Sequence, residues 1–518
     1  MDLILYNGTI YTQDKTKKAE AIAIKGECIH NLGSNEEILK LKTNKTALVD
    51  LKGSLAIPGF NDSHIHLSGT GLYLENINLS KTKSIKEIKE VVGEKAKTKK
   101  TGEIVFGRGW NQDNLAEKRL LNKTDLDEIA TDKGIILYRV CGHIAVVNSY
   151  VLKQINPNLK IVGGNIDYEK GIFYENALEL LSGLMPEVTV ETIKDNLRRG
   201  ISHANKLGLT SVQSDDFGDY KKVLSAYQEL KQAGELTLRV YEQSLLPDIN
   251  SLKAFIHDGY KTGVGDDYFK IGPLKLLLDG SLGAHTAALS IPYNDKPETK
   301  GILTYTDDVL NEIITYAAKH GMQIAIHGIG DRAIKQALDQ IAKLDYQGAR
   351  HSIIHLQITD EEIIARLKAL HTLALVQPIF LDYDHKIVEK RVGTKLASTS
   401  YRLKTLLDKG IKIGLGTDSP VETLDPIKNL YLATSGKDLD GNPIYNPNEV
   451  ISLEEAVFNY TYGSSYASFT EEYKGLLKPG YLADITVLDK DIFNIDKNDL
   501  LHTKVRYTIV GGQIVYQK

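Results

Sequence analysis

The middle of the chain alternates short apolar runs with longer segments in which apolar residues recur every three or four positions. The short runs predict buried strands, and the longer segments predict amphipathic helices. This alternation predicts about eight βα units, the number that closes a TIM barrel. An open, doubly wound sheet is the alternative, and it is disfavoured because no glycine-rich phosphate loop follows the first strand. We therefore predict an α/β protein built on a (β/α)8 barrel.

The predicted barrel elements follow one another from residue 60 to residue 415. Strands are expected at 60–67, 209–214, 236–244, 268–278, 322–326, 352–354, 372–377 and 411–415. Helices are expected at 191–207, 220–233, 252–257, 307–320, 333–344, 360–370 and 401–409. In the helix at 307–320, Asp307 or Asp308 is the expected N-cap, and Gly321 is expected to end the helix.

The two ends of the chain have a different pattern, made of short strands and tight turns. The first 54 or so residues contain strand-like runs separated by Asn7-Gly8 and Lys25-Gly26, and the far end has a run broken by Gly511-Gly512. Neither end has enough strands to bury a core alone. We predict that residues 1–57 and 473–518 meet in one small β-sandwich, because chain ends often lie close together.

Residues 71–187 do not follow the βα alternation. They separate the first barrel strand from the helix that should return from it. We predict that they form an insertion that covers the active site at the barrel's C-terminal face. The remaining residues from 58 to 472 form the predicted catalytic barrel domain.

The composition is that of an ordinary globular protein. The chain has 518 residues, 42% of them hydrophobic and 25% charged, and a net charge of -4. So small a charge gives no case for nucleic acid or a membrane as partner, and leaves a small-molecule substrate as the expected one. Two cysteines are too few for a disulfide framework, and no secretory signal is visible, so we expect a cytoplasmic location.

A pair of histidines carries the first chemical signal. His64 and His66 lie two residues apart in a predicted strand, so both side chains point the same way. Two imidazoles aimed at one point suit a divalent transition metal. The alternative is a chance spacing, with one histidine simply hydrogen-bonded at the surface. The presence of further ligands elsewhere in the chain would favour the metal site over a chance spacing.

Further polar residues interrupt or follow the apolar barrel strands at their C-terminal ends, where TIM barrels have their active sites. They are Lys275, His327, His355 and Asp418. Each has a structural alternative: His327 could cap the next helix, and Asp418 could be a turn residue before Ser419-Pro420. A lysine within an apolar run is seldom buried unpaired. Together with the histidine pair, these residues predict a metal site at the C-terminal face.

Seven motifs resemble the amidohydrolase superfamily, and within it the YtcJ-like branch, amidohydrolase family 3, which includes N-substituted formamide deformylases. The motifs are PGFNDSHIHL, GRGWNQD, CGHIAVVNS, LKLLLDGSLGAHTAAL, IAIHGIGDRAI, HSIIHLQ and GTDSPV. They span almost the whole predicted barrel. The resemblance implies a metal-dependent hydrolase of a non-peptide C–N bond and a homodimer.

The resemblance also implies a binuclear centre, most often of zinc. His64, His66 and Asp418 would hold one ion, and His327 and His355 the other. A carboxylated Lys275 would bridge both. This explains a lysine among the ligands, because a carbamate is an anionic oxygen ligand and an ammonium group is not.

A metal-bridging hydroxide is then expected to attack the carbonyl of a small amide or N-substituted formamide. Asp418 would take the proton and deliver it to the leaving nitrogen, as general base and then general acid. His143 would either donate to the developing oxyanion or make a structural hydrogen bond within the insertion. Arg108, Trp110 and Arg332 are candidate substrate-binding residues.

Trp110, Asp331 and Arg332 also have structural alternatives. Trp110 could simply pack the insertion. Asp331 and Arg332 could orient His327 or only begin the next helix.

Competing functions remain open. Superfamily deaminases usually carry a His-x-x-Glu sequence after the fifth strand, whereas His327 is followed by Gly328-Ile329-Gly330-Asp331. That difference argues against a deaminase, as does a lysine ligand. An ester hydrolase would use the same two metals. A non-catalytic binding or regulatory protein is less favoured, because the full ligand set is present.

Overall fold

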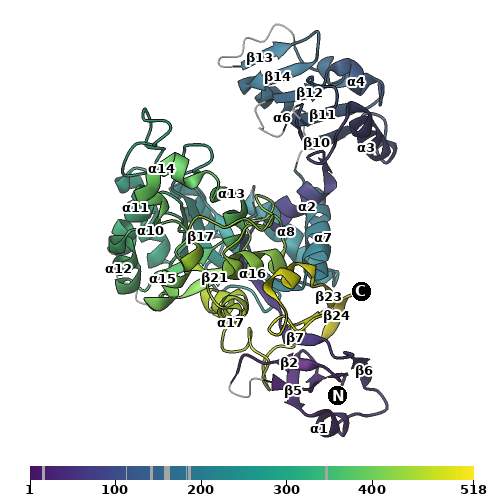
Figure 1. The fold of residues 1–518 in the computed structure, drawn as a ribbon, viewed down its shortest axis with the longest axis vertical. Coiled ribbons are helices and arrows are strands. Elements are labelled where there is room, and N and C mark those ends of the chain that lie inside the picture. Colours follow the sequence, from purple (N-terminus) through teal and green to yellow (C-terminus); the bar gives the residue numbers. More distant parts are fainter. Residues whose placement is uncertain are drawn as a thin grey trace. The chain divides into compact units, whose positions relative to one another are not determined.

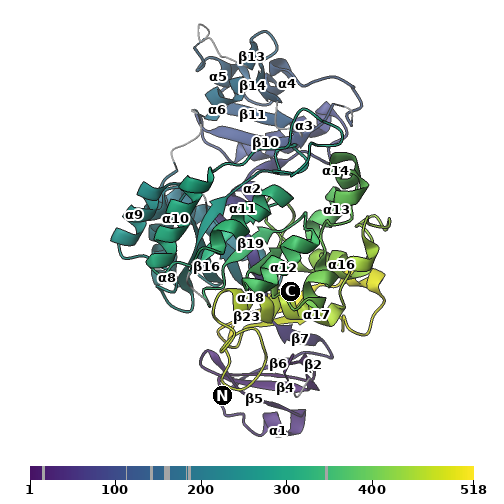
Figure 2. The same ribbon diagram turned by 90° about the vertical axis from the view of Figure 1, so that its left-hand side faces the viewer.

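The computed structural model describes residues 1–14, 18–112, 114–139, 144–156, 164–182, 184, 188–216, 218–344 and 348–518. It contains two compact units: Met1–Thr70 with Ile193–Lys518, and Gly71–Thr192. Figures 1 and 2 show the elements of both units. Among the described residues, no helix is both long and apolar enough to cross a membrane.

The first unit contains a nearly closed barrel of eight parallel strands, which confirms the predicted fold class. The strands, in sheet order from one edge to the other, are β8 (Phe60–Ile65), β15 (Leu209–Ser214), β16 (Arg239–Leu245), β17 (Phe269–Leu277), β18 (Ile324–Gly328), β19 (Ser352–His355), β20 (Leu373–Val376) and β21 (Ile413–Leu415). Almost every residue in them is buried, as expected of parallel strands covered on both faces.

Helices connect the barrel strands and surround them (Figures 1 and 2). They are α2 (Leu67–Glu75), α7 (Val190–Lys206), α8 (Tyr220–Gln232), α9 (Ile249–His257), α10 (Asp307–Lys319), α11 (Asp331–Ile341), α12 (Glu361–Ala369), α13 (Leu381–Asp384), α14 (Val388–Ala397), α15 (Leu403–Asp408), α16 (Pro426–Ser435), α17 (Leu453–Phe458) and α18 (Ser464–Ala467). Their apolar faces are buried, as in α10, where Leu310, Ile313, Ile314 and Ala317 face inward.

The barrel closes between β8 and β21 at the level of the candidate site. Beyond the end of β21, the Asp418 amide donates to the His64 carbonyl at 2.8 Å, and the His66 amide donates to the Ser419 carbonyl at 2.8 Å. The buried carboxylate of Asp62 adds to this closure. It accepts hydrogen bonds from the Thr417 amide (3.0 Å), the Thr417 hydroxyl (2.8 Å) and the Tyr460 hydroxyl (2.9 Å).

Two sheets from the chain ends share one core, which confirms the predicted sandwich. One sheet holds β1 (Leu3–Tyr6), β4 (Ala21–Lys25), β5 (Cys28–Gly33) and β6 (Ala47–Asp50), with α1 (Asn35–Leu39) beside it. The other holds β2 (Thr9–Tyr11), β3 (Lys18–Ala19), β7 (Leu55–Pro58), β22 (Ile485–Leu488), β23 (Val505–Val510) and β24 (Gln513–Gln517). The pairing of β7 with β22 joins the two ends of the chain.

The second unit has a sheet of its own. Its strands are β9 (Ile77–Asn78), β10 (Ile104–Trp110), β11 (Gly134–Arg139), β12 (Ile144–Val147), β13 (Gly164–Asp167) and β14 (Ile172–Glu175). Its helices are α3 (Ile85–Lys97), α4 (Lys123–Asp127), α5 (Ser149–Leu152) and α6 (Glu179–Ser182). Parallel pairs β9–β10–β11 are followed by antiparallel pairs. The expectation that it covers the active site stays a prediction.

Candidate metal site

The six predicted ligands all lie at the C-terminal ends of barrel strands. His64 is on β8 and His66 follows it, Lys275 is on β17, His327 on β18 and His355 on β19, and Asp418 follows β21. Strands far apart in sequence therefore bring these side chains to one end of the barrel, as the TIM-barrel geometry requires.

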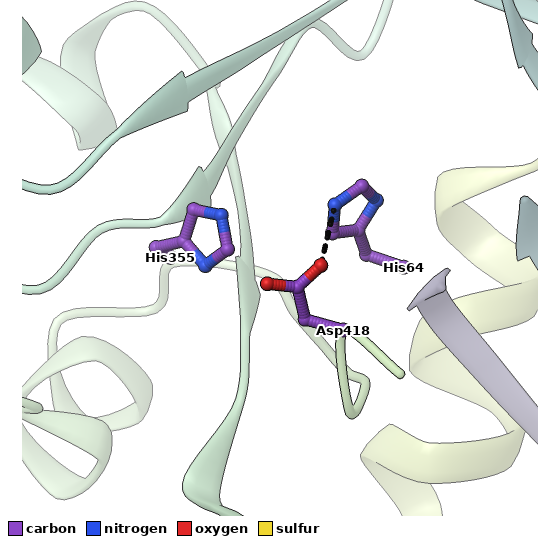
Figure 3. A group of neighbouring side chains, drawn as sticks. All are labelled: His64, His355 and Asp418. Carbon is purple, nitrogen blue, oxygen red and sulfur yellow. Dashed lines mark ion pairs between the residues drawn. The ribbon is translucent and has the colours of Figure 1, made fainter. Parts of the chain in front are cut away.

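Three of these residues form a compact, buried group. One donor atom each from His64, His355 and Asp418 lies within 4.8 Å of the others. Figure 3 shows the Asp418 carboxylate between the two imidazole rings. His66 adds a fourth donor, because its Nε2 lies 3.0 Å from Asp418 Oδ1, while His64 Nε2 lies 3.3 Å from the same oxygen.

Hydrogen bonds on the far side of two rings determine which nitrogen faces this group. His64 Nδ1 lies 2.6 Å from Gln243 Oε1, and the Gln243 amide nitrogen donates to the Ser63 carbonyl, which fixes the amide's orientation. His66 Nδ1 lies 2.6 Å from the Asp215 carbonyl. Each Nδ1 therefore carries the proton and donates it, which leaves both Nε2 lone pairs directed at Asp418.

This arrangement fits a metal ion. Two unprotonated nitrogens that face one carboxylate oxygen at 3.0 and 3.3 Å repel it unless positive charge lies between them. A divalent cation supplies that charge, and imidazole nitrogen with carboxylate oxygen is a donor set that Zn²⁺ and similar ions accept. The residues present therefore suit a metal, with His64, His66, His355 and Asp418 as its nearest candidate ligands.

The pKa values of His64, His355 and Asp418 favour the same conclusion, whereas at His66 burial is outweighed by Asp418, which raises the pKa of that ring above its ordinary value. Burial, together with the nearby Lys275 charge, lowers the pKa of His64 to about 4, so the ring is neutral at pH 7. Burial and the neighbouring His327 hold the pKa of His355 well below its ordinary value. Burial opposes ionisation of Asp418, but its interactions with His64 and His66 outweigh burial and hold the pKa of Asp418 well below its ordinary value. Neutral imidazoles and an ionised carboxylate are the forms that bind metals.

The backbone at two of these ligands is strained. Asp418 has a φ of 56° and His355 a φ of 72°, both in the left-handed region that non-glycine residues seldom adopt. Such strain persists only where the surrounding structure imposes it, and it gathers at functional sites.

Lys275 is buried beside the group and has an anionic partner. Its Nζ lies 3.0 Å from Asp215 Oδ2, and the two side chains are 1% and 0% exposed. The other carboxylate oxygen of Asp215 is buried without a hydrogen-bond partner among the described residues. In its ammonium form, Lys275 is thus neutralised by an aspartate that the sequence analysis did not identify.

His327 contacts the group through its ring. The centroids of the His327 and His355 rings are 4.4 Å apart. His327 Nε2 lies 3.1 Å from the Gly280 carbonyl and 3.3 Å from Asp279 Oδ1, so Nδ1 is the nitrogen that remains for a ligand. Asp279 is itself held by the amides of Ala288, Ile329 and Gly330.

Of the two alternatives for Asp331 and Arg332, the structure favours the second, because α11 begins at Asp331. The Asp331 carboxylate accepts hydrogen bonds from the Ser290 amide, at 2.8 Å, and from the Ser290 hydroxyl. It thereby ties the start of α11 to the loop after β17, while Asp279 orients His327. Arg332 is half-buried, and its Nη2 donates to the Gly301 carbonyl at 3.4 Å.

Two further predicted site residues, Arg108 and Trp110, lie on β10 of the second unit. His143 lies outside the described residues. Arg108 is exposed on β10. Trp110 is completely buried in that unit's core, and its indole nitrogen donates to the Leu137 carbonyl at 3.0 Å. This burial favours the packing role for Trp110 over a place in a substrate pocket.

Sequence reasoning missed three residues that orient ligands: Asp215, Gln243 and Asp279. Each is a polar residue at or just after the C-terminal end of an apolar barrel strand, namely β15, β16 or β17. The same signal identified the ligands themselves, but it does not show which of several polar residues at a strand end faces a ligand.

The comparisons with known proteins agree with this geometry. The profile of the amidohydrolase family matches residues 47–516. The chain is 31% identical over 535 residues to YtcJ of Bacillus subtilis, which is named as an amidohydrolase, with 100% of each chain covered. It is 22% identical to the N-substituted formamide deformylase of Arthrobacter pascens, covering 100% of this chain and 98% of that one.

A solved structure is similar over nearly its full length. It is that of an uncharacterized metal-dependent hydrolase from Pyrococcus furiosus. The TM-score is 0.81 at 33% sequence identity, with 94% of this chain and 99% of that chain covered. The chain therefore belongs to the amidohydrolase family, in its YtcJ-like branch.

Proposed function

We propose that the protein hydrolyses a non-peptide C–N bond in a small amide or an N-substituted formamide. Its family and its buried histidine and aspartate group make it a metal-dependent hydrolase. What we propose in addition is that the bond it cleaves is a C–N bond. The observation that carries the proposal is the convergence of His64, His355 and Asp418, with His66 beside them.

The residues of the site have distinct tasks. His64, His66, His355 and Asp418 would hold a divalent metal, which lowers the pKa of water and polarises a carbonyl group when bound. Asp418 is ionised, and its Oδ1 faces the two histidines. That leaves Oδ2 to accept a proton and to return it to the leaving nitrogen, the general base and general acid of the reaction.

A second ion and a carboxylated Lys275 belong to the same proposal. His327 Nδ1 and the Lys275 carbamate would be its ligands, and zinc is the expected metal. Carboxylation replaces the positive charge of Lys275 by a negative charge next to Asp215. We therefore expect the carbamate only when cations are bound, so carboxylation and metal content should rise together.

The choice of substrate rests on a relative. The N-substituted formamide deformylase that matches this chain over its full length supports a formamide or small amide. Homodimer assembly and a cytoplasmic location stay predictions from the sequence.

The test uses zinc-loaded protein and N-benzylformamide. We expect formate and benzylamine to be released, about two zinc ions per chain by plasma mass spectrometry, and a loss of at least about 100-fold in kcat for Asp418→Asn. The matched control is Asp408→Asn, a surface aspartate whose side chain is 57% exposed. Hydrolysis that survives Asp418→Asn, or that needs no metal, would overturn the proposal.

A further inference from the structure

A cavity of about 190 Å³ lies in the barrel unit beside the candidate metal site. The residues that matter for its chemistry are His355, Phe380, Tyr383, Asp384, Tyr401 and Glu422. His355 is also one of the candidate metal ligands. A molecule that fills this cavity therefore touches a residue of the reactive group.

The size of the cavity limits its occupant. An apolar cavity of about 150 Å³ holds a benzene molecule, and pockets for drug-sized ligands start at about 300 Å³. At about 190 Å³, this cavity suits a group of ring size or a short chain rather than a large ligand. The cavity is consequently matched to the small substrates of the proposed function.

Aromatic rings form part of its wall. Phe380, Tyr383 and Tyr401 line the cavity. The ring of Phe380 meets the His355 ring edge-on, with centroids 6.0 Å apart and planes at 88°. Aromatic faces attract cations as well as apolar groups.

Two carboxylates line the same cavity. Asp384 Oδ2 accepts hydrogen bonds from the Tyr401 hydroxyl at 2.7 Å and from the Gln357 amide at 3.0 Å. Both donors are neutral, so they hold Asp384 in place without supplying a counter-charge, and burial raises the pKa of this carboxyl above its ordinary value. Glu422 lies within electrostatic range of Asp382 and Asp384. Among the described residues, no lysine or arginine forms an ion pair with Asp384 or Glu422.

The cations nearby in sequence have other partners. His385 and Lys386 lie 3.2 and 3.5 Å from Asp438, and Arg402 lies 2.7 Å from Glu361. Burial, with the negative charges of Asp382 and Asp384, raises the pKa of Glu422 to about 7. The cavity thus holds two carboxyl groups that no cation of the described residues pairs with, and a bound cation would favour their ionised forms.

We infer that this cavity binds the non-reacting part of the substrate and selects small amides that carry an ammonium or amidinium group. The inference rests on the proposed function. The aromatic wall would hold the carbon skeleton, Asp384 and Glu422 would pair with the cationic nitrogen, and the amide would lie towards His355.

The first experiment measures binding without catalysis. Isothermal titration calorimetry compares benzylamine with its neutral analogue benzyl alcohol on zinc-loaded protein. We expect benzylamine to bind at least about tenfold more tightly, and Glu422→Gln and Asp384→Asn each to remove most of that difference. The matched control is Glu36→Gln. Glu36 lies on α1, and its side chain is 82% exposed. Equal binding of the two compounds would overturn the inference, as would unchanged selectivity in both variants.

The second experiment tests whether the cavity recognises a cationic group of the substrate or only the amine that is released as product. N-(2-aminoethyl)formamide and N-propylformamide have nearly the same shape and differ in one charge. We expect kcat/KM to be at least about tenfold higher for the charged compound. Glu422→Gln should remove this difference by raising KM for the charged compound. Equal kcat/KM values would overturn the inference, because any cation binding would then belong to the product. If neither formamide reacts, the proposed function fails, while the calorimetry still decides the inference.

Discussion

Three of the candidate ligands are each held in place by a residue from another strand or loop. Gln243 on β16 fixes the His64 ring, the Asp215 carbonyl fixes the His66 ring, and Asp279 fixes His327. Such partners decide which ring nitrogen is free and raise its basicity, so a metal site depends on them nearly as much as on the ligands.

The ion pair of Lys275 with Asp215 gives a prediction about the metal-free protein. Both side chains are buried, 3.0 Å apart, so removing one partner leaves the other as an uncompensated charge. We expect Lys275→Met and Asp215→Asn each to cost about 3–5 kcal/mol of unfolding free energy, and the double variant to cost about 2 kcal/mol less than the sum. Thermal unfolding of the four chelator-treated proteins measures this. Strictly additive losses would mean that the two groups are not paired.

Lys474 gives a prediction about pH. Its amine is buried, donates to the Ser211 hydroxyl at 2.9 Å, and burial lowers its pKa from 10.5 to about 7. Below pH 7 the amine is charged in both the folded and the unfolded protein, so the free-energy cost of burying a charge lowers the stability in full. Between about pH 7 and 10.5 the folded state has lost this proton and the unfolded state has kept it. Stability should therefore rise with pH in this window, by up to about 1.4 kcal/mol per pH unit.

The comparison with Lys474→Met isolates this effect from other titrating groups. We expect the variant to be more stable than the wild type at pH 7, and its advantage to shrink as the pH rises to 10. Urea unfolding at several pH values follows both proteins. A constant difference between the two proteins across that range would contradict the prediction.

The ligands could be predicted from the sequence and most of their partners were not. His64, His355 and Asp418 stand out because a polar residue interrupts or follows an apolar strand, and barrel geometry then brings strand ends together. Asp215 and Gln243 also lie at or next to the ends of predicted strands, but each is surrounded by other polar residues, in Gln-Ser-Asp-Asp and Glu-Gln-Ser. Which of these residues faces a ligand depends on the register between strands, which no local pattern encodes.

At the scale of elements, the strands of the barrel were predicted well, whereas for the insertion only the range was predicted and none of its strands and helices. All eight barrel strands were placed within a few residues, because buried parallel strands are continuous apolar runs. The N-cap of α10 was placed wrongly: it is Thr306, whose hydroxyl accepts from the Val309 amide, rather than Asp307 or Asp308. The strands of the 71–192 unit belong to a mixed parallel and antiparallel sheet, so they lack the regular alternation that marks the barrel.

A buried ion pair joins the barrel to the terminal sandwich. Arg239, the first residue of β16, donates from Nε to Asp484 Oδ2 at 2.8 Å and from Nη2 to Oδ1 at 3.1 Å, and both side chains are 3% exposed. Asp484 immediately precedes β22 of the sandwich. We expect Asp484→Asn to cost about 3 kcal/mol or more, because it leaves a buried guanidinium without its counter-charge.

The same arginine offers the control for this prediction. Glu27 Oε2 lies 3.4 Å from Arg239 Nη2, but its side chain is 51% exposed. Glu27→Gln should therefore cost less than about 1 kcal/mol. Thermal unfolding of both variants tests the contrast, and equal losses would show that burial does not decide the strength of this contact.

At the scale of the whole molecule, the chain combines two units that each have their own core. The candidate ligands all lie in the unit made of Met1–Thr70 and Ile193–Lys518. The only tryptophan of the chain, Trp110, is buried in the core of the other unit. Tryptophan fluorescence consequently reports the unfolding of Gly71–Thr192, whereas far-UV circular dichroism reports both units.

This separation leads to a prediction about metal removal. A ligand stabilises the unit that binds it, by about 3–4 kcal/mol at 100 to 1,000 times its Kd. We expect a chelator to lower the unfolding temperature seen by circular dichroism and to leave the fluorescence transition of Trp110 unchanged. His355→Ala, which removes a ligand, should make the dichroism transition insensitive to chelator. A fluorescence transition that shifts together with the dichroism would contradict the prediction, because it would mean that metal binding also stabilises the Gly71–Thr192 unit.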